Sequence, residues 1–66
     1  MNNQLQEFAR QTIKDGLSKL PEDWQRKFKL MYGKESMSIE EVVEKMDESK
    51  LDWAMQQVEK SLAKLA

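Results

Sequence analysis

Residues 51–65 read LDWAMQQVEKSLAKL, and the apolar side chains in this stretch recur every three or four positions. On an α-helix that spacing gathers apolar side chains on one side and leaves amide and charged side chains on the other. The apolar stripe consists of Leu51, Ala54, Met55, Val58, Leu62 and Leu65. A helix with one apolar side is stabilised mainly by packing, so the stretch predicts a helix within a helical bundle.

A first helix is predicted for residues 3–19, where apolar side chains again recur at intervals of three and four. Its apolar stripe consists of Leu5, Phe8, Ala9, Ile13, Leu17 and Leu20. Gly16 lies near the middle of this stripe, and two interpretations of it remain open. The glycine either lets a neighbouring helix approach closely or ends the helix one turn early.

A second helix is predicted to begin within residues 20–23, which read LPED, and to end at Gly33. Pro21 fits the first helical position, and the two acidic residues after it complement the positive end of the helix dipole. The core stripe of this helix consists of Trp24, Phe28 and Met31, with Leu30 and Tyr32 on its flanks.

Two serine motifs predict where the remaining helices begin. Residues 38–41 read SIEE, a capping box in which the serine hydroxyl and a glutamate side chain each bond a backbone N–H. This motif predicts a short third helix over residues 39–46, and Ser49 offers a second cap for a fourth helix. We therefore expect a single all-α domain over residues 1–66. The expected fold is a compact bundle of three to four helices, in which the two long helices enclose the shorter middle pair.

The composition argues against most catalytic and metal-dependent functions. The 66 residues include 11 basic and 12 acidic side chains but no histidine and no cysteine. Without these two residue types the chain lacks the usual general base, the usual nucleophile pairs and thiolate metal ligands. We therefore expect a protein that is not an enzyme and that uses no cofactor or metal. The apolar runs fall far short of the roughly 20 residues that a transmembrane helix needs, so we expect a cytoplasmic protein without a membrane partner.

Charge is unevenly distributed along the chain. Residues 1–34 carry seven basic and four acidic side chains, and residues 35–66 carry four basic and eight acidic side chains. The acids concentrate in residues 35–52, where no apolar pocket is predicted that would raise a carboxyl pKa for acid–base catalysis. This acidic segment either attracts the basic half across the fold or docks on a basic surface of another macromolecule, and both interpretations remain open. Its candidate contact residues are Glu40, Glu44 and Glu48.

Trp53 departs from the apolar stripe of the last helix, because it projects about 200° away from Leu51 around the helix axis. The side chains near it on that side are Gln56, Gln57, Lys60 and Lys64. Tryptophan is enriched at the energetic centres of interfaces, so this side of the helix is predicted to be a contact face. Its candidate partner-binding residues are Trp53, Gln56, Gln57 and Lys60. The alternative is that Trp53 packs against the first helix or against the turn at residues 47–49.

The spacing of four segments carries a resemblance to a known family. The segments are residues 20–22 (LPE), 28–32 (FKLMY), 38–43 (SIEEVV) and 58–65. Together they resemble region 4 of bacterial sigma factors, a helix-turn-helix DNA reader, which implies that residues 39–46 support a recognition helix from Lys50 onward. The side chains facing the major groove would be Lys50, Trp53, Gln56 and Gln57, and glutamine can bond adenine there. Val43 and Asp47 depart from the small residue and the glycine of that motif, and a net charge of −1 offers little phosphate neutralisation.

A second resemblance covers most of the chain. It rests on residues 19–24 (KLPEDW), 28–33 (FKLMYG) and 43–62, which include LDWAMQQV at 51–58. These segments resemble small helical proteins of tailed bacteriophages and prophages in overall pattern, without a diagnostic catalytic motif. The resemblance implies a bacterial host cytoplasm and an accessory protein that binds or inhibits a host factor.

One preferred function and two alternatives follow from these patterns. We expect a non-enzymatic, phage-type protein that binds a host or phage macromolecule through an exposed helix face and modulates it, with a protein as the expected partner. The first alternative is a helix-turn-helix transcriptional regulator that binds DNA. The second is a homo-oligomeric structural protein in which a second copy covers Trp53.

Overall fold

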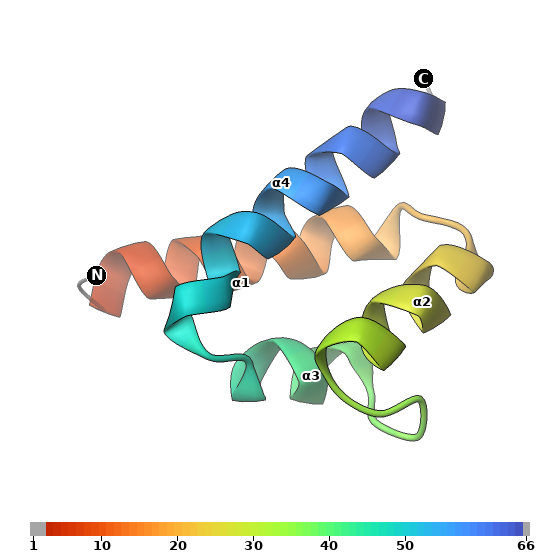
Figure 1. Cartoon of the computed structure of the whole chain (residues 1–66). Helices are drawn as coiled ribbons and strands as arrows, with labels where there is room; N and C mark the ends of the chain where they lie inside the picture. Colours follow the sequence, from red (N-terminus) through yellow and green to blue (C-terminus); the bar gives the residue numbers. More distant parts are fainter. Residues whose placement is uncertain (1–2, 66) are drawn as a thin grey trace.

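The structure, a computed structural model, describes residues 3–65, and all regular secondary structure in this part of the chain is helical (Figure 1). The helices are α1 (Asn3–Ser18), α2 (Glu22–Tyr32), α3 (Ile39–Lys45) and α4 (Glu48–Leu65). The prediction of an all-α bundle is confirmed. The predicted ends of the domain, at residues 1 and 66, lie outside the described residues.

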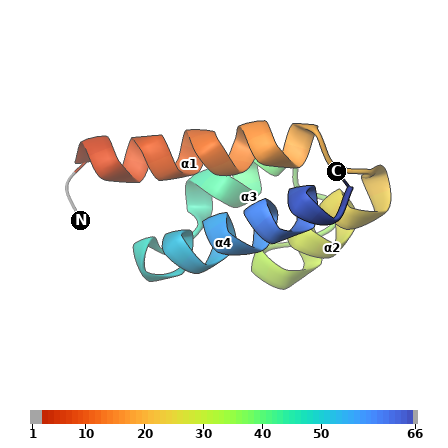
Figure 2. The same cartoon turned by 90° about the horizontal axis from the view of Figure 1, so that it is seen from above.

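The two long helices, α1 and α4, lie side by side and run in the same direction (Figures 1 and 2). The two long helices therefore contact each other directly, whereas the sequence led us to expect that they enclose the middle pair. Helix α3 packs against α1, and α2 packs against α3. Gly16 explains this close contact, because a Cβ added there would lie 2.3 Å from Val58 Cγ1. Since α1 continues past Gly16 to Ser18, the glycine admits a neighbouring helix and does not end its own.

The core consists of apolar side chains that come from all four helices and from the turns between them. They are Ala9, Ile13, Leu17, Leu20, Phe28, Val42, Val43, Met46, Leu51, Ala54 and Val58. Full burial of one aliphatic side chain contributes about 1.5–3 kcal/mol, so this cluster supplies the main stabilisation of the fold. Among the described residues, no polar or charged side chain is buried with it.

The predicted boundaries of α2 and α3 agree closely with the structure. Ser38 caps α3, since its Oγ accepts the N–H of Glu41 at 3.1 Å, which confirms this half of the capping box. Gly33 follows the last residue of α2, as predicted. Pro21 lies one position before α2 and not at its first position, and its carbonyl accepts the N–H groups of Trp24 at 3.0 Å and Gln25 at 3.1 Å.

The start of α4 was predicted incorrectly. The helix begins at Glu48, so Ser49 lies inside it and does not cap it. The Ser49 hydroxyl donates a hydrogen bond to Asp47 Oδ2 at 2.5 Å, and the Asp47 carbonyl accepts the N–H of Lys50 at 2.9 Å. The connection between α3 and α4 is short, because Met46 adopts an extended backbone conformation and ends α3 at Lys45.

Four apolar side chains that the sequence assigned to core stripes are exposed instead. They are Leu5, Phe8, Met31 and Leu65. Leu5 and Phe8 lie near the start of α1 and Leu65 at the end of α4, where the long helices extend past their neighbours (Figure 1). Met31 is 58% exposed for a different reason, because α2 faces α4 across a groove.

Candidate functional site

The side of α4 that faces away from the core carries the predicted contact residues. The Trp53 side chain is 59% exposed, whereas Leu51, two positions earlier, is fully buried. The predicted departure of Trp53 from the core is therefore confirmed, and the alternative in which the chain itself buries this side chain is wrong. Gln56 and Lys60 are exposed and Gln57 is partly buried. We call these four residues, Trp53, Gln56, Gln57 and Lys60, the Trp53 face.

Gln57 ties the Trp53 face to α2. The Tyr32 hydroxyl at the end of α2 donates a hydrogen bond to Gln57 Oε1 at 2.7 Å. Partial burial raises the pKa of Tyr32, so the phenol stays protonated and able to donate this bond near neutral pH. The Tyr32 ring also lies against Phe28, with centroids 4.7 Å apart. The end of α2 is therefore held beside the middle of α4.

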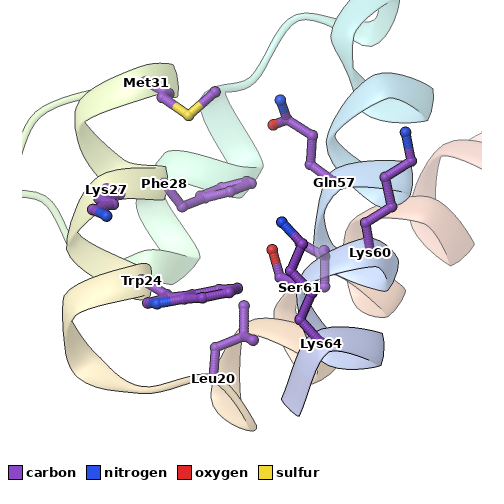
Figure 3. A pocket seen from close by; sticks show the side chains of 10 residues that line it. Leu20, Trp24, Lys27, Phe28, Met31, Gln57, Lys60, Ser61 and Lys64 are labelled. Carbon is purple, nitrogen blue, oxygen red and sulfur yellow. The ribbon is translucent and has the colours of Figure 1, made fainter. Parts of the chain in front are cut away.

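A groove opens between α2 and α4 beyond this hydrogen bond (Figure 3). It has a volume of about 360 Å³. Apolar side chains form most of its lining, namely Leu20, Trp24, Phe28, Met31 and Val58, and polar or basic side chains complete it, namely Lys27, Gln57, Lys60, Ser61 and Lys64. The rings of Trp24 and Phe28 extend from α2 toward α4 and lie one above the other along the floor of the groove (Figure 3). We call this feature the α2–α4 groove.

The Trp53 face and the α2–α4 groove are continuous. Gln57 and Lys60 belong to both, and Trp53 lies one helical turn before Gln57 on the same side of α4. An exposed indole therefore stands at the Tyr32 end of an apolar groove. A macromolecule that contacts Trp53 can place side chains in the groove as well.

The candidate residues of the acidic segment lie elsewhere, since Glu40, Glu44 and Glu48 do not line the groove. Glu44 forms an ion pair with Lys14 on α1, and the hydrogen bond from this lysine lowers the pKa of Glu44. Glu40 is exposed and Glu48 is partly buried. The acidic set therefore faces α1 in part and forms no continuous surface with the groove.

Two ion pairs within the chain join its basic half, residues 1–34, to the acidic segment, residues 35–52. One is the pair between Lys14 and Glu44, and the other joins Arg26 Nε to Glu35 Oε1 at 3.1 Å. Arg10 adds a hydrogen bond from its guanidinium group to the backbone carbonyl of Val43 in α3. The contacts match the interpretation that the acidic segment attracts the basic half across the fold.

The sequence patterns missed the groove because they assigned Trp24 and Met31 to the core. A signal was present on α4, where Lys60, Ser61 and Lys64 follow one another on the side toward α2. A helix that packs tightly against Trp24 and Met31 would carry apolar residues at those positions. Polar residues opposite an apolar stripe are typical of two helices that do not close on each other.

Within residues 3–65, no cluster of three or more acidic, histidine or cysteine side chains could hold a metal ion. None of the helices in this part of the chain is long and apolar enough to cross a bilayer. The groove and the Trp53 face define a small helical bundle with an accessible surface of mixed apolar and basic character. Comparisons with protein-family models, curated proteins and solved structures found no match for the chain.

Proposed function

We propose that this chain is a non-enzymatic binding module that docks on another protein through the Trp53 face and modulates it. The observation that carries the proposal is the exposed Trp53 indole, on a helix whose opposite side buries Leu51, Ala54 and Val58 in the core. Leaving a large aromatic side chain in water forgoes the stabilisation of burial, and tryptophan is among the residues most enriched in binding hot spots. A phage-type accessory protein acting on a host factor in a bacterial cytoplasm fits this role.

The Trp53 face is a better candidate surface than the acidic segment. Glu44 and Glu35 are already paired with Lys14 and Arg26, so docking on a basic partner would have to compete with these internal pairs. Exposed ion pairs also contribute little free energy, about 0–1 kcal/mol each. An exposed aromatic anchor beside an apolar groove supplies a larger favourable term on burial.

DNA recognition by α4 receives less support from the side-chain contacts. Reading adenine requires both the oxygen and the nitrogen of a glutamine amide. Gln57 Oε1 already accepts a hydrogen bond from Tyr32, so one of the two acceptor positions of this amide oxygen is occupied within the fold. The formal net charge of −1 adds no long-range attraction to phosphate.

The proposal is tested by capture from nuclease-treated bacterial lysate with the full chain, Trp53→Ala and Phe8→Ala. Phe8 is the matched control, because it is an equally exposed aromatic side chain, 67% accessible, on a different helix. We expect a specific protein to be retained by the full chain and by Phe8→Ala and to be lost with Trp53→Ala. The captured protein is then purified and added to the variant Trp24→Phe, in which Trp53 is the only indole of this chain. We expect binding to shift the Trp53 fluorescence to the blue.

Three results would contradict the proposal. Equal retention by Trp53→Ala would remove the Trp53 face from the interaction. Retention that appears only when the nuclease is omitted would favour the DNA-binding alternative. An elution volume that depends on concentration in the full chain but not in Trp53→Ala, with nothing retained, would favour the homo-oligomer.

A further inference from the structure

The α2–α4 groove has a chemical character that specifies its occupant more closely than the Trp53 face does. Its floor is apolar, with the Trp24 ring partly exposed to the space between the helices and the Phe28 ring buried at the bottom (Figure 3). Lys27 stands on the α2 side, and Lys60 and Lys64 stand on the α4 side (Figure 3). The groove therefore has an apolar centre between two basic edges.

The charge on these edges is not neutralised within the described residues. None of the three lysines forms an ion pair there, in contrast to Lys14 and Arg26 on the other surfaces. No acidic side chain lines the groove, and the neighbouring acids Asp23 and Glu59 are not part of the lining. In a protein with more acidic than basic residues, the groove is a local concentration of positive charge.

We infer that the α2–α4 groove binds an amphipathic helix of the partner that carries acidic residues on both sides of an apolar stripe. The inference rests on the proposed function and names the partner surface. Apolar side chains spaced one turn apart would lie over Trp24, Phe28 and Met31, in the way that a helix occupies an apolar groove. Glutamate or aspartate beside that stripe would pair with Lys27 on one edge and Lys60 or Lys64 on the other.

The shape and lining of the groove favour a helix over other occupants. Two helices already form its walls, so a third can pack along them by the usual fitting of side-chain ridges into grooves. A bilayer surface is flat and cannot reach Phe28, which is 5% exposed at the bottom of the groove. Duplex nucleic acid would match the lysines but would leave the apolar floor without a partner, because its bases are stacked inside the double helix.

The test uses two synthetic peptides with the same leucine stripe, one flanked by glutamates and the other by lysines. Binding to the ¹⁵N-labelled full chain is followed through the indole N–H signal of Trp24, and a Trp53→Phe spectrum serves only to assign the two indole signals. We expect the glutamate peptide to shift the Trp24 signal and to bind about tenfold more tightly than the lysine peptide at low salt. The difference should shrink as salt is added, because the lysines are exposed to solvent.

A charge-matched pair of variants assigns the preference to the groove. Reversing Lys27, Lys60 and Lys64 to glutamate should invert the order of the two peptides. The control reverses three exposed lysines that do not line the groove, Lys34, Lys45 and Lys50, and so changes the net charge equally. This control should keep the preference for the glutamate peptide.

Every other outcome overturns the inference, and none of them decides the proposed function, which depends on Trp53. Equal affinity for both peptides would contradict the charge preference. If neither peptide binds near 1 mM, about the weakest affinity such a docking site would show, the proposal of a helical occupant is wrong. A stronger Trp24 shift with anionic lipid vesicles or duplex DNA would assign the groove to those partners. A Trp24 signal that depends on protein concentration without peptide would assign it to a second copy of the chain.

Discussion

Helix α4 meets α1 and α2 in two different ways. Toward α1 it is sealed, since Ala54 is fully buried and Gly16 leaves so little space that a methyl group would clash with Val58. Toward α2 it is open, since Trp24 faces Ser61 and Lys64 across a groove of about 360 Å³ (Figure 3). One helix thus has one closed side and one accessible side.

The size and polarity of a few residues account for this difference. Small residues at the α1–α4 contact let the two backbones approach and leave no room for a ligand. On the other side, long polar residues of α4 oppose the aromatic side chains of α2, and a hydrogen bond between Tyr32 and Gln57 joins them at one end. The closed side contributes core packing, and the open side stays accessible to solvent.

The largest expected contrast comes from two positions on α4 that point in opposite directions. Leu51→Ala should lower the free energy of unfolding by about 2–5 kcal/mol, because Leu51 is fully buried and its truncation leaves a cavity. Trp53→Ala should change it by less than about 0.5 kcal/mol, because the indole is exposed. Urea denaturation followed by circular dichroism measures both. A loss of more than about 1 kcal/mol in Trp53→Ala would mean that this side chain has a structural role.

A smaller effect is expected where the closed side is tightest. Gly16→Ala should destabilise the protein by about 1–3 kcal/mol, since the new methyl group must displace Val58, although alanine regains up to about 1 kcal/mol of helix propensity. The double variant Gly16→Ala/Val58→Ala provides the control, because it restores the space. It should be more stable than Val58→Ala alone. If Gly16→Ala is as stable as the unsubstituted protein, the α1–α4 contact is looser than the distance implies.

The sequence predicted the closed side better than the open side. The periodic stripes through Ile13, Leu17, Leu51 and Val58 identified the helices and most of the core, because apolar spacing depends only on local geometry. The serine half of the capping box at Ser38 was also confirmed, because it depends on residues close together in the sequence. The start of α4 was predicted incorrectly, because both Ser49 and the residues before it favour a helix N-terminus. In the structure the helix begins at Glu48, one residue before Ser49.

The candidate site could be predicted only in part. The exposure of Trp53 followed from its angle around α4, a local property. The groove did not, because it depends on how far α2 stands from α4, and no periodic pattern contains that distance. Met31 shows this limit: its spacing from Trp24 and Phe28 is that of a core residue, yet no helix covers it. The contact between Tyr32 and Gln57, 25 positions apart, is equally beyond local reasoning.

The next effect concerns the one hydrogen bond that links the two walls of the groove. Tyr32→Phe should lower the free energy of unfolding at pH 7 by about 0.5–1.5 kcal/mol, near the lower limit because water can reach Gln57. Gln56→Ala, which removes an exposed amide one position away, is the control and should have no measurable effect. An unchanged stability of Tyr32→Phe would mean that the groove is held in place without this bond.

The burial of Tyr32 gives a pH dependence with a defined sign. Burial raises the pKa of Tyr32, so the folded protein holds the phenolic proton more tightly than the unfolded chain. The stabilisation is complete below the ordinary tyrosine pKa of about 10 and is lost as the pH rises through the higher folded value. The difference in stability between the unsubstituted protein and Tyr32→Phe should therefore shrink in denaturation curves measured at increasing alkaline pH.

The smallest effect is expected on the surface away from the groove, at the ion pair between Lys14 and Glu44. The hydrogen bond from Lys14, helped by the positive charges of Lys14 and Arg10, lowers the pKa of Glu44 against the opposing effect of desolvation. Glu44→Gln should cost about 0.5 kcal/mol or less at pH 7, because the Glu44 side chain is exposed and water screens the pair. Glu40→Gln, on the same helix and without an ion pair in residues 3–65, should cost nothing measurable.

The sign of the pH dependence is opposite to that of Tyr32. A lowered folded pKa means that the stabilisation by Glu44 is present above the ordinary glutamate value of about 4.3 and disappears as the pH falls through the lower folded value. The stability curves of the unsubstituted protein and Glu44→Gln should therefore converge in acid, and also in high salt at pH 7. Curves that stay apart in acid would mean that the substitution acts through packing and not through charge. In that case Lys14 would not neutralise the Glu44 carboxylate, and this charge would remain available to a partner of the acidic segment.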